Sequence, residues 1–148
     1  MKKQKTNTMN TQNIYLEHAN ITVNNLDTAV DFFQAAFPDF QIRGGGDTNG
    51  RKWIHLGNDI TYIALNETLV QKMNVKDYTQ PGINHLGFVV EDVNVIAERL
   101  LAAGYQRDYP KQEENYRIRD YFADADGNQY EFVQYLSDSI DERNFYDA

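Results

Sequence analysis

The feature that most constrains this sequence of 148 residues is an internal duplication. A shift of 67 positions aligns the segment 17–23 with the segment 84–90, which places His18 on His85. The alignment continues without a gap into the residues that follow, and apolar positions fall on apolar positions. Two of the 3 histidines in the chain are paired in this way. Two similar halves in one chain predict two structural modules of the same kind.

Each half opens with a predicted strand and continues with a predicted helix. Apolar and polar residues alternate over 18–23 and 85–90, which is typical of a strand with one buried face. Apolar residues then recur at helical spacing, and Pro38 and Gly104 mark the ends of the two helices. The candidate N-cap residues are Asn25 or Asp27 for the first helix and Asp92 or Asn94 for the second.

Short strands separated by turns complete each half. The expected strands cover 40–43, 52–56 and 60–66 in the first half, and 116–123 and 129–135 in the second. The glycine-rich segment 44–50 is expected to be a turn. It is not a phosphate-binding loop, because no Lys-Ser or Lys-Thr pair follows it and no helix is expected after it. Both halves are therefore predicted to have the order βαβββ.

The sequence predicts one structured domain with a short segment on each side. We expect a disordered leader over 1–13, which lacks the apolar core of a secretory signal. The domain covers 14–136, with modules at about 14–67 and 83–136 and a linker over 67–82. The acidic tail over 137–148 is expected to pack on the body of the protein or on a partner subunit.

The composition excludes several classes of function. A formal net charge of −8 repels the phosphate backbone and anionic membrane surfaces, so we expect no nucleic-acid or membrane partner. The chain has 0 Cys, which excludes disulfides, thiolate metal sites and a cysteine nucleophile. No apolar run approaches the roughly 20 residues of a membrane helix. We therefore expect a cytoplasmic protein.

Three residues at related positions are candidate metal ligands. The same shift of 67 carries Ala64 onto Glu131, so that His18, His85 and Glu131 occupy three of four equivalent places. Two imidazoles and one carboxylate form a facial triad, which leaves coordination positions open for substrate, water or oxygen. The sequence therefore predicts one divalent ion, which can be Fe, Mn, Ni or Zn. The simpler alternative is a pair of hydrogen-bonded strand histidines retained after duplication.

The segments 17–23, 84–90 and 122–132 resemble the vicinal oxygen chelate superfamily over about residues 15–135. That superfamily contains glyoxalase I, extradiol dioxygenases, and fosfomycin- and bleomycin-resistance proteins. The resemblance implies an α+β fold in which two tandem βαβββ modules form a cup-shaped mixed β-sheet with helices on the outside. It also implies a small-molecule substrate, a homodimer, and His18, His85 and Glu131 as the metal ligands.

Departures from the family pattern separate its branches. Glyoxalase I has a fourth protein ligand where this chain has Ala64, so the resemblance favours the three-ligand branches. These branches place a tyrosine ten residues before the glutamate, and Tyr121 is that residue here. Fosfomycin-resistance enzymes have Thr where this chain has Asn20. Extradiol dioxygenases use further histidines, and only His55 remains for that role.

The remaining predictions concern the cavity and the reaction. Tyr121 is the candidate catalytic hydrogen-bond or proton donor, and Asn20, Tyr62 and Asn66 are candidate substrate-binding residues because they share the histidine face by strand parity. A metal-dependent dioxygenase, lyase or transferase is the first hypothesis. A non-catalytic small-molecule binder resembling bleomycin-resistance proteins and a structural metal site are the alternatives. The metal site can form within one chain or be shared between two.

Overall fold

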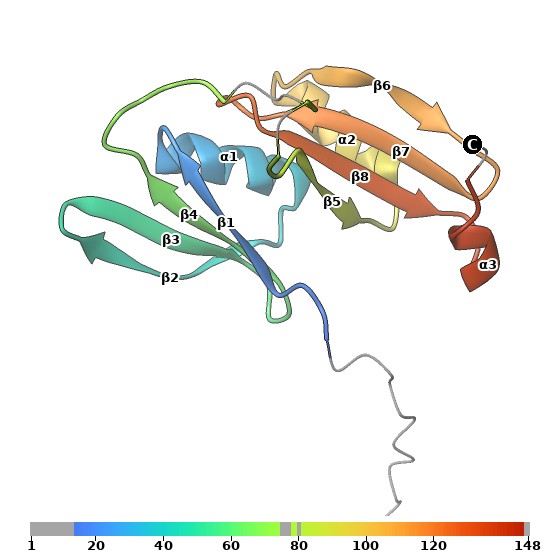
Figure 1. Ribbon diagram of the computed structural model, residues 1–148, viewed down its shortest axis with the longest axis horizontal. Coiled ribbons are helices and arrows are strands. Elements are labelled where there is room, and N and C mark those ends of the chain that lie inside the picture. The colour runs from blue at the N-terminus through green and yellow to red at the C-terminus, as the bar shows by residue number, and fades with distance from the viewer. Residues whose placement is uncertain (1–13, 75–77, 80, 147–148) are drawn as a thin grey trace, which may run out of the picture.

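Two four-stranded sheets and two long helices make up the fold of this computed structural model, which describes residues 14–74, 78–79 and 81–146 (Figure 1). The expected leader, 1–13, lies outside the described residues. The first module contains β1 (His18–Val23), α1 (Leu26–Ala36), β2 (Gln41–Thr48), β3 (Arg51–Gly57) and β4 (Tyr62–Glu67). The second contains β5 (His85–Val89), α2 (Val93–Ala102), β6 (Arg107–Glu113), β7 (Arg117–Ala123) and β8 (Gln129–Tyr135), and is followed by α3 (Ile140–Arg143).

Both modules have the same strand order and nearly the same register. The sheets read β1-β4-β3-β2 and β5-β8-β7-β6, with the first strand of each module parallel to its last and the other pairs antiparallel. His18 is paired with Tyr62, and His85 is paired with Gln129, so the shift of 67 holds for both members of each pair. The two-module βαβββ prediction is confirmed.

The two long helices begin in the same way. The N-caps are Asn25 and Asp92, each one of the two residues expected at its position. The backbone N–H of Leu26 donates to Oε2 of Glu67 at 3.0 Å, and that of Val93 donates to Oε1 of Gln134 at 3.0 Å. Each module therefore uses a side chain at the end of its last strand to bind the start of its helix.

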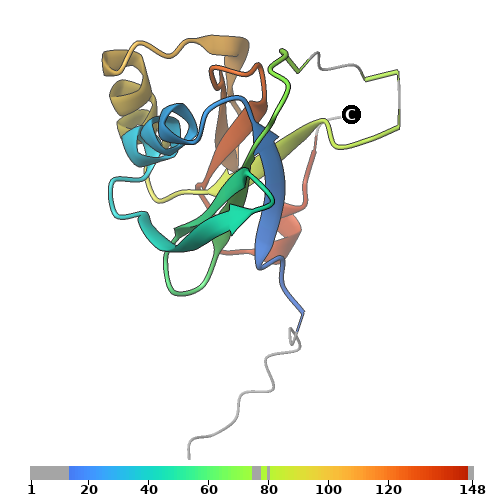
Figure 2. The ribbon, with the colours of Figure 1, turned by 90° about the vertical axis from the view of Figure 1, so that its left-hand side faces the viewer.

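The two modules share one hydrophobic core. Figure 2 shows α1 and α2 together on one side, with both sheets spreading from them. Side chains of α1 and its C-cap reach into the second module: Phe33 meets Tyr130 edge to face at 5.0 Å, and the C-cap Phe37 meets Phe132 at 5.7 Å. The most deeply buried core residues are Val23, Phe32, Phe33, Ala36, Leu56, Leu65, Val93, Leu100, Phe122, Tyr130 and Phe132. The helices cover one face of each sheet, so the opposite faces stay open for a site.

The glycine-rich segment is a strand, and the expectation of a turn over 44–50 was wrong. β2 runs through the glycines, and the chain reverses only at Asn49 and Gly50, whose φ angles are 55° and 81°. A Cβ atom on Gly45 would lie 2.8 Å from the carbonyl oxygen of Trp53 on the neighbouring strand. Glycine is therefore required by the close approach of β3 rather than by a turn.

The tail packs on its own chain through a buried arginine. The Arg117 side chain is 1% exposed, and its guanidinium donates to the backbone oxygens of Arg143 and Phe145 and lies 3.8 Å from the centroid of the Tyr146 ring. It also pairs with Glu114 at 2.7 Å. Among the described residues, no helix has both the length and the apolar character that a membrane crossing requires.

Candidate metal centre

His85 and Glu131 lie side by side on the open face of the second sheet. His85 begins β5, Glu131 lies on the adjacent strand β8, and the register places Gly87 opposite Glu131. The Nε2 atom of His85 is 3.0 Å from Oε2 of Glu131. Ligand bonds of about 2.0–2.2 Å put neighbouring donor atoms of one ion about 3 Å apart. This pair therefore fits a divalent cation in both donor chemistry and spacing.

Tyr121 is paired with Glu131 across β7 and β8. Burial, followed by the negative charge of Glu131, raises the pKa of the Tyr121 phenol to about 12, against an opposing effect of Arg119. The phenol is therefore neutral near pH 7 and keeps its proton for donation. The catalytic role that the sequence analysis expected of Tyr121 stays a prediction.

Arg119 is a charged residue of this site that the sequence analysis did not identify. Its Nη1 atom donates to the Tyr121 hydroxyl at 3.2 Å and lies 3.8 Å from Oε1 of Glu131. Its Nη2 atom pairs with Glu114, which also holds Arg117. A signal was present in the sequence, since a residue two positions before Tyr121 on a strand points to the same face.

A cavity of about 350 Å³ adjoins this group and is large enough for a small ligand. The Tyr109 ring meets the Tyr121 ring at 5.3 Å and forms part of the wall. The lining residues are Tyr78, His85, Tyr109, Gln112, Arg119, Tyr121 and Gln129. Its wall is polar and aromatic, which suits a small substrate that carries oxygen atoms.

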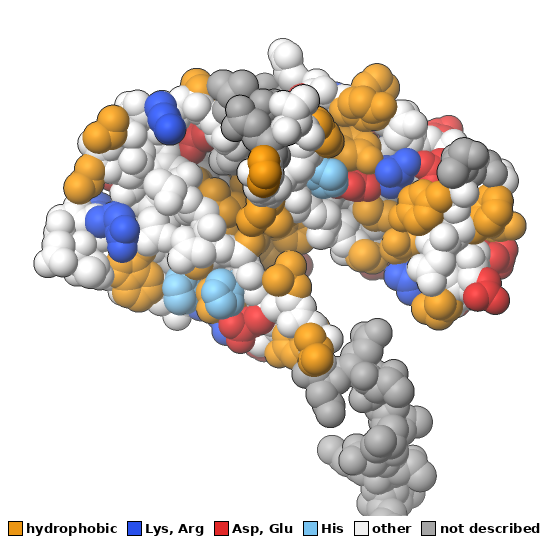
Figure 3. Space-filling view, in the orientation of Figure 1, with side chains coloured by type: hydrophobic (Ala, Val, Ile, Leu, Met, Phe, Trp, Pro, Cys, Tyr) orange, Lys and Arg blue, Asp and Glu red, His pale blue; other side chains and the backbone are white. Residues whose placement is uncertain are grey.

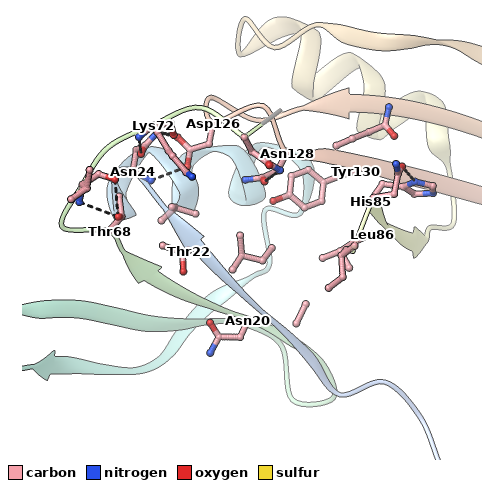
Figure 4. Close-up of a pocket in the computed structure, with 18 residues that line it drawn as sticks. Asn20, Thr22, Asn24, Thr68, Lys72, His85, Leu86, Asp126, Asn128 and Tyr130 are labelled. Carbon is pink, nitrogen blue, oxygen red and sulfur yellow. Dashed lines mark hydrogen bonds between the residues drawn. The ribbon is translucent and has the colours of Figure 1, made fainter. Parts of the chain in front are cut away.

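A second cavity, of about 360 Å³, lies between the two modules (Figure 4). Asn20 and Thr22 lie on one side of it, and His85 and Leu86 lie on the other. Asn24 joins the modules at the rim, because its backbone and side-chain nitrogens donate to the Asp126 carboxylate at 2.9 Å. His85 lines both cavities.

His18 lies on the open face of the first sheet, in a stack of rings. Its imidazole lies parallel to the Tyr62 ring at 4.7 Å, and His55 stacks on the same tyrosine at 4.6 Å. The Arg43 guanidinium lies 4.4 Å from the centre of the Tyr62 ring. The Nδ1 atom of His18 is 2.9 Å from Oε1 of Glu17, and this bond lowers the pKa of the Glu17 carboxyl.

The structure brings together two of the three expected ligands. His18 and His55 stack on the same Tyr62 ring in the first module, whereas His85 contacts Glu131 in the second. The space-filling view shows histidine side chains at two separate places on the surface (Figure 3). Within the described ranges, no group of three or more His, Cys, Asp or Glu side chains is placed to hold a metal ion. His85 and Glu131 are adjacent, and His18 lies in the other module.

The candidate substrate-binding residues occupy two different environments. Asn66 donates its side-chain N–H to Oδ1 of Asn20 at 2.5 Å, and Asn20 also lines the cavity between the modules. Tyr62 lies instead in the ring stack against His18. Ala64, where glyoxalase I resemblance would require a ligand, is 3% exposed and is paired with His55.

Comparisons with solved structures find the same fold in proteins from several bacteria. A glyoxylase/bleomycin resistance protein/dioxygenase domain from Frankia sp. EAN1pec is 27% identical, with a TM-score of 0.70 over 82% of this chain and 98% of that one. A glyoxalase family protein from Bacillus cereus is 18% identical, with a TM-score of 0.68 over 84% and 95% of the two chains. The fosfomycin resistance protein FosX from Listeria monocytogenes is 20% identical, with a TM-score of 0.67 over 87% and 97%.

A mutant of the Listeria FosX protein was solved in complex with Mn(II) and 1S,2S-dihydroxypropylphosphonic acid. A search of curated proteins finds no match. A family model does match, over residues 15–132, a range that begins before β1 and ends within β8. The repeated βαβββ modules, the shared fold and this match lead to one conclusion: the chain belongs to the Glyoxalase/Bleomycin resistance protein/Dioxygenase superfamily.

Proposed function

We propose that this protein is a metal-dependent enzyme of the three-ligand type, with His18, His85 and Glu131 as ligands of one divalent ion. The observation that carries the proposal is the 3.0 Å approach of His85 Nε2 to Glu131 Oε2 beside the Tyr121 phenol. The Mn(II) complex of a FosX protein with the same fold supports the choice of a divalent ion. The substrate is a small polar molecule, and glyoxalase I activity is not expected because Ala64 offers no donor.

The side chains around the pair suit chemistry at a substrate oxygen. A divalent ion, when bound, supplies Lewis acidity and open positions for substrate oxygens. Tyr121 holds a proton on its phenol oxygen and donates it, or a hydrogen bond, to the substrate. Arg119 orients that phenol through the 3.2 Å bond from its Nη1 atom. The cavity of about 350 Å³ beside them takes the rest of the substrate.

We further propose that a second copy of the chain supplies His18, which makes the protein a homodimer with two shared sites. The separation of His18 from the His85–Glu131 pair within one chain supports this arrangement. Exposed apolar side chains at the cavity between the modules also support it, since Val70 is 75% and Ile83 is 83% exposed. A partner subunit that covers them would remove apolar surface from water.

Metal binding by the purified full-length chain tests the proposal. We expect close to one divalent ion per chain, and we expect His85→Ala and Glu131→Ala to lose it while their apo forms unfold at the wild-type temperature. His55→Ala is the matched control, since it also removes one imidazole and should keep the ion. Retention of the full metal content by His85→Ala would show that the ligand assignment is wrong.

Turnover is tested separately with catechols, thiol hemiacetals and fosfomycin. We expect Tyr121→Phe to keep the metal and the substrate affinity but to lower kcat by about 10²–10⁴-fold, because general acid catalysis is lost. The second candidate function is non-catalytic binding, which the cavity of about 360 Å³ between the modules favours. A binder would show a ligand-dependent rise in unfolding temperature that does not require added metal, together with no turnover.

A further inference from the structure

The residues that directly precede the two candidate histidine ligands make the same contact in both modules. Oε1 of Glu17 is 2.9 Å from Nδ1 of His18, and Oδ1 of Asn84 is 2.9 Å from Nδ1 of His85. Glu17 and Asn84 are related by the same shift of 67 that relates the histidines. The duplication has therefore retained a histidine and an oxygen acceptor beside it, with the same ring nitrogen bound in each case.

This contact bears on which nitrogen of each ring carries the proton and which can bind a metal ion. A neutral imidazole carries its proton on one nitrogen and a lone pair on the other, and a hydrogen bond to one nitrogen fixes the tautomer. Oε1 of Glu17 and Oδ1 of Asn84 can only accept, so both contacts call for a proton on Nδ1 and leave Nε2 as the nitrogen that can be presented to a metal ion. In the second module Nε2 is also the nitrogen that forms the 3.0 Å hydrogen bond with Oε2 of Glu131, the other proposed ligand.

Ring contacts restrict the remaining rotation of each imidazole. The His18 ring lies at only 12° to the Tyr62 ring, which holds its plane. The His85 ring meets the Tyr121 ring edge to face, at 6.2 Å and 77°. Each histidine is therefore held at its Nδ1 edge by the preceding residue and at its side by a tyrosine.

We propose that Glu17 and Asn84 are positioning residues of the metal site, each holding Nδ1 of the following histidine so that Nε2 binds the divalent ion. The inference rests on the proposed metal-binding function and adds two residues that reach the ion only through another side chain. Acceptors of this kind raise the basicity of a histidine ligand and fix its orientation, and their removal typically costs 10–100-fold in metal affinity.

The two positions differ in charge, which allows the contributions of the charge and of the hydrogen-bond acceptor to be tested separately. Glu17 offers a carboxylate and Asn84 a neutral amide oxygen. Glu17→Gln keeps an oxygen acceptor at the same place, so its affinity should stay closer to wild type than that of Glu17→Ala. Asn84→Asp adds a negative charge beside a ligand and should bind the ion at least as tightly as wild type.

The experiment is a calorimetric titration of the full chain with Mn(II), combined with unfolding of the apo proteins. We expect Asn84→Ala and Glu17→Ala to weaken Mn(II) binding about 10–100-fold, with unfolding temperatures of the apo forms unchanged. Glu91→Ala and Asn115→Ala are the matched controls, because they make the same substitutions at exposed places and should bind as wild type. Wild-type affinity in both Asn84→Ala and Glu17→Ala would overturn the inference.

A second readout reports the tautomer itself. In the Zn(II)-loaded chain with ¹⁵N-labelled histidine, we expect the NMR pattern of an Nδ1–H, Nε2-bound ring for His18 and His85, with His55→Ala removing the third signal set. A Zn(II)-bound Nδ1 at either ring would contradict the assignment. Failure of the wild-type chain to bind Mn(II) or Zn(II) would instead refute the proposed function, so the two failures can be told apart.

Discussion

Asp124, at the residue scale, shows how a single carboxylate fixes the turn that leads into β8. Its Oδ1 atom accepts from the backbone N–H groups of Asp126 and Asn128, both at 2.9 Å. Its Oδ2 atom accepts from the side chain of Asn128 and from the Tyr130 hydroxyl, both at 3.0 Å. Burial raises the pKa of the Asp124 carboxyl against these bonds, each of which favours the charged form.

We expect Asp124→Ala to lower the free energy of unfolding by about 2–3 kcal/mol, because the nearly inaccessible Tyr130 hydroxyl loses its acceptor. Urea denaturation measures the change. In a Tyr130→Phe background the same substitution should cost less, since the hydroxyl is already absent. Asp59→Ala, at an exposed turn residue, should change stability by less than about 0.5 kcal/mol. Equal costs for both aspartates would contradict the role given to Asp124.

At the scale of a single element, strand β2 leads to a prediction, because two adjacent glycines in it have very different surroundings. A Cβ atom on Gly45 would approach the carbonyl oxygen of Trp53 to 2.8 Å, whereas one on Gly44 would meet nothing within 4 Å. We expect Gly45→Ala to destabilise the protein by about 1–3 kcal/mol. Gly44→Ala should be neutral or stabilising by up to about 1 kcal/mol, because it restricts only the unfolded chain. Thermal unfolding of the two variants compares them, and the reverse order would mean that β2 and β3 are not this close.

The contacts of the C-terminal segment lead to a second prediction at the scale of an element. Deletion of 137–148 removes the two backbone oxygens and the Tyr146 ring that surround the Arg117 guanidinium. We expect a loss of about 2–4 kcal/mol in the free energy of unfolding, because a buried charge loses its partners. Ile140→Ser, at an exposed position of α3, should cost less than about 0.5 kcal/mol. A deletion as mild as this control would show that the segment does not hold Arg117.

At the scale of the whole molecule, the proposed metal site is complete only if two chains associate and share it. Mixing two variants tests whether they do. In a shared site, His18→Ala and His85→Ala chains each lose the ion alone, but a heterodimer of the two has one intact site. Mixed in equal amounts, they should recover about one quarter of the wild-type metal content. Analytical ultracentrifugation should show a dimer throughout. Dimers with no recovery after subunit exchange would exclude a site shared between chains.

Much of the architecture could be predicted because it depends on local pattern and on the duplication. Strand 129–135, the caps Asn25 and Asp92 and the βαβββ order follow from alternation, capping chemistry and the repeat, which act between residues close in sequence. The strand conformation of the glycines in β2 could not be predicted. Glycine is needed there because Trp53 on the neighbouring strand approaches closely, which is a contact across the sheet. Arg119 was missed because its importance comes from Glu131, which lies on a neighbouring strand.

The sequence by itself determined that the chain has two equivalent modules and which face of each strand carries His18, His85 and Glu131. Period and duplication are properties of the chain alone, so they can be read without coordinates. Only the tertiary structure decided that His85 and Glu131 approach to 3.0 Å while His18 lies on the other sheet. That outcome depends on how the two modules pack around one core, where Phe33 and Phe37 contact the second module. Packing between segments that are distant in the chain leaves no periodic signal in the sequence.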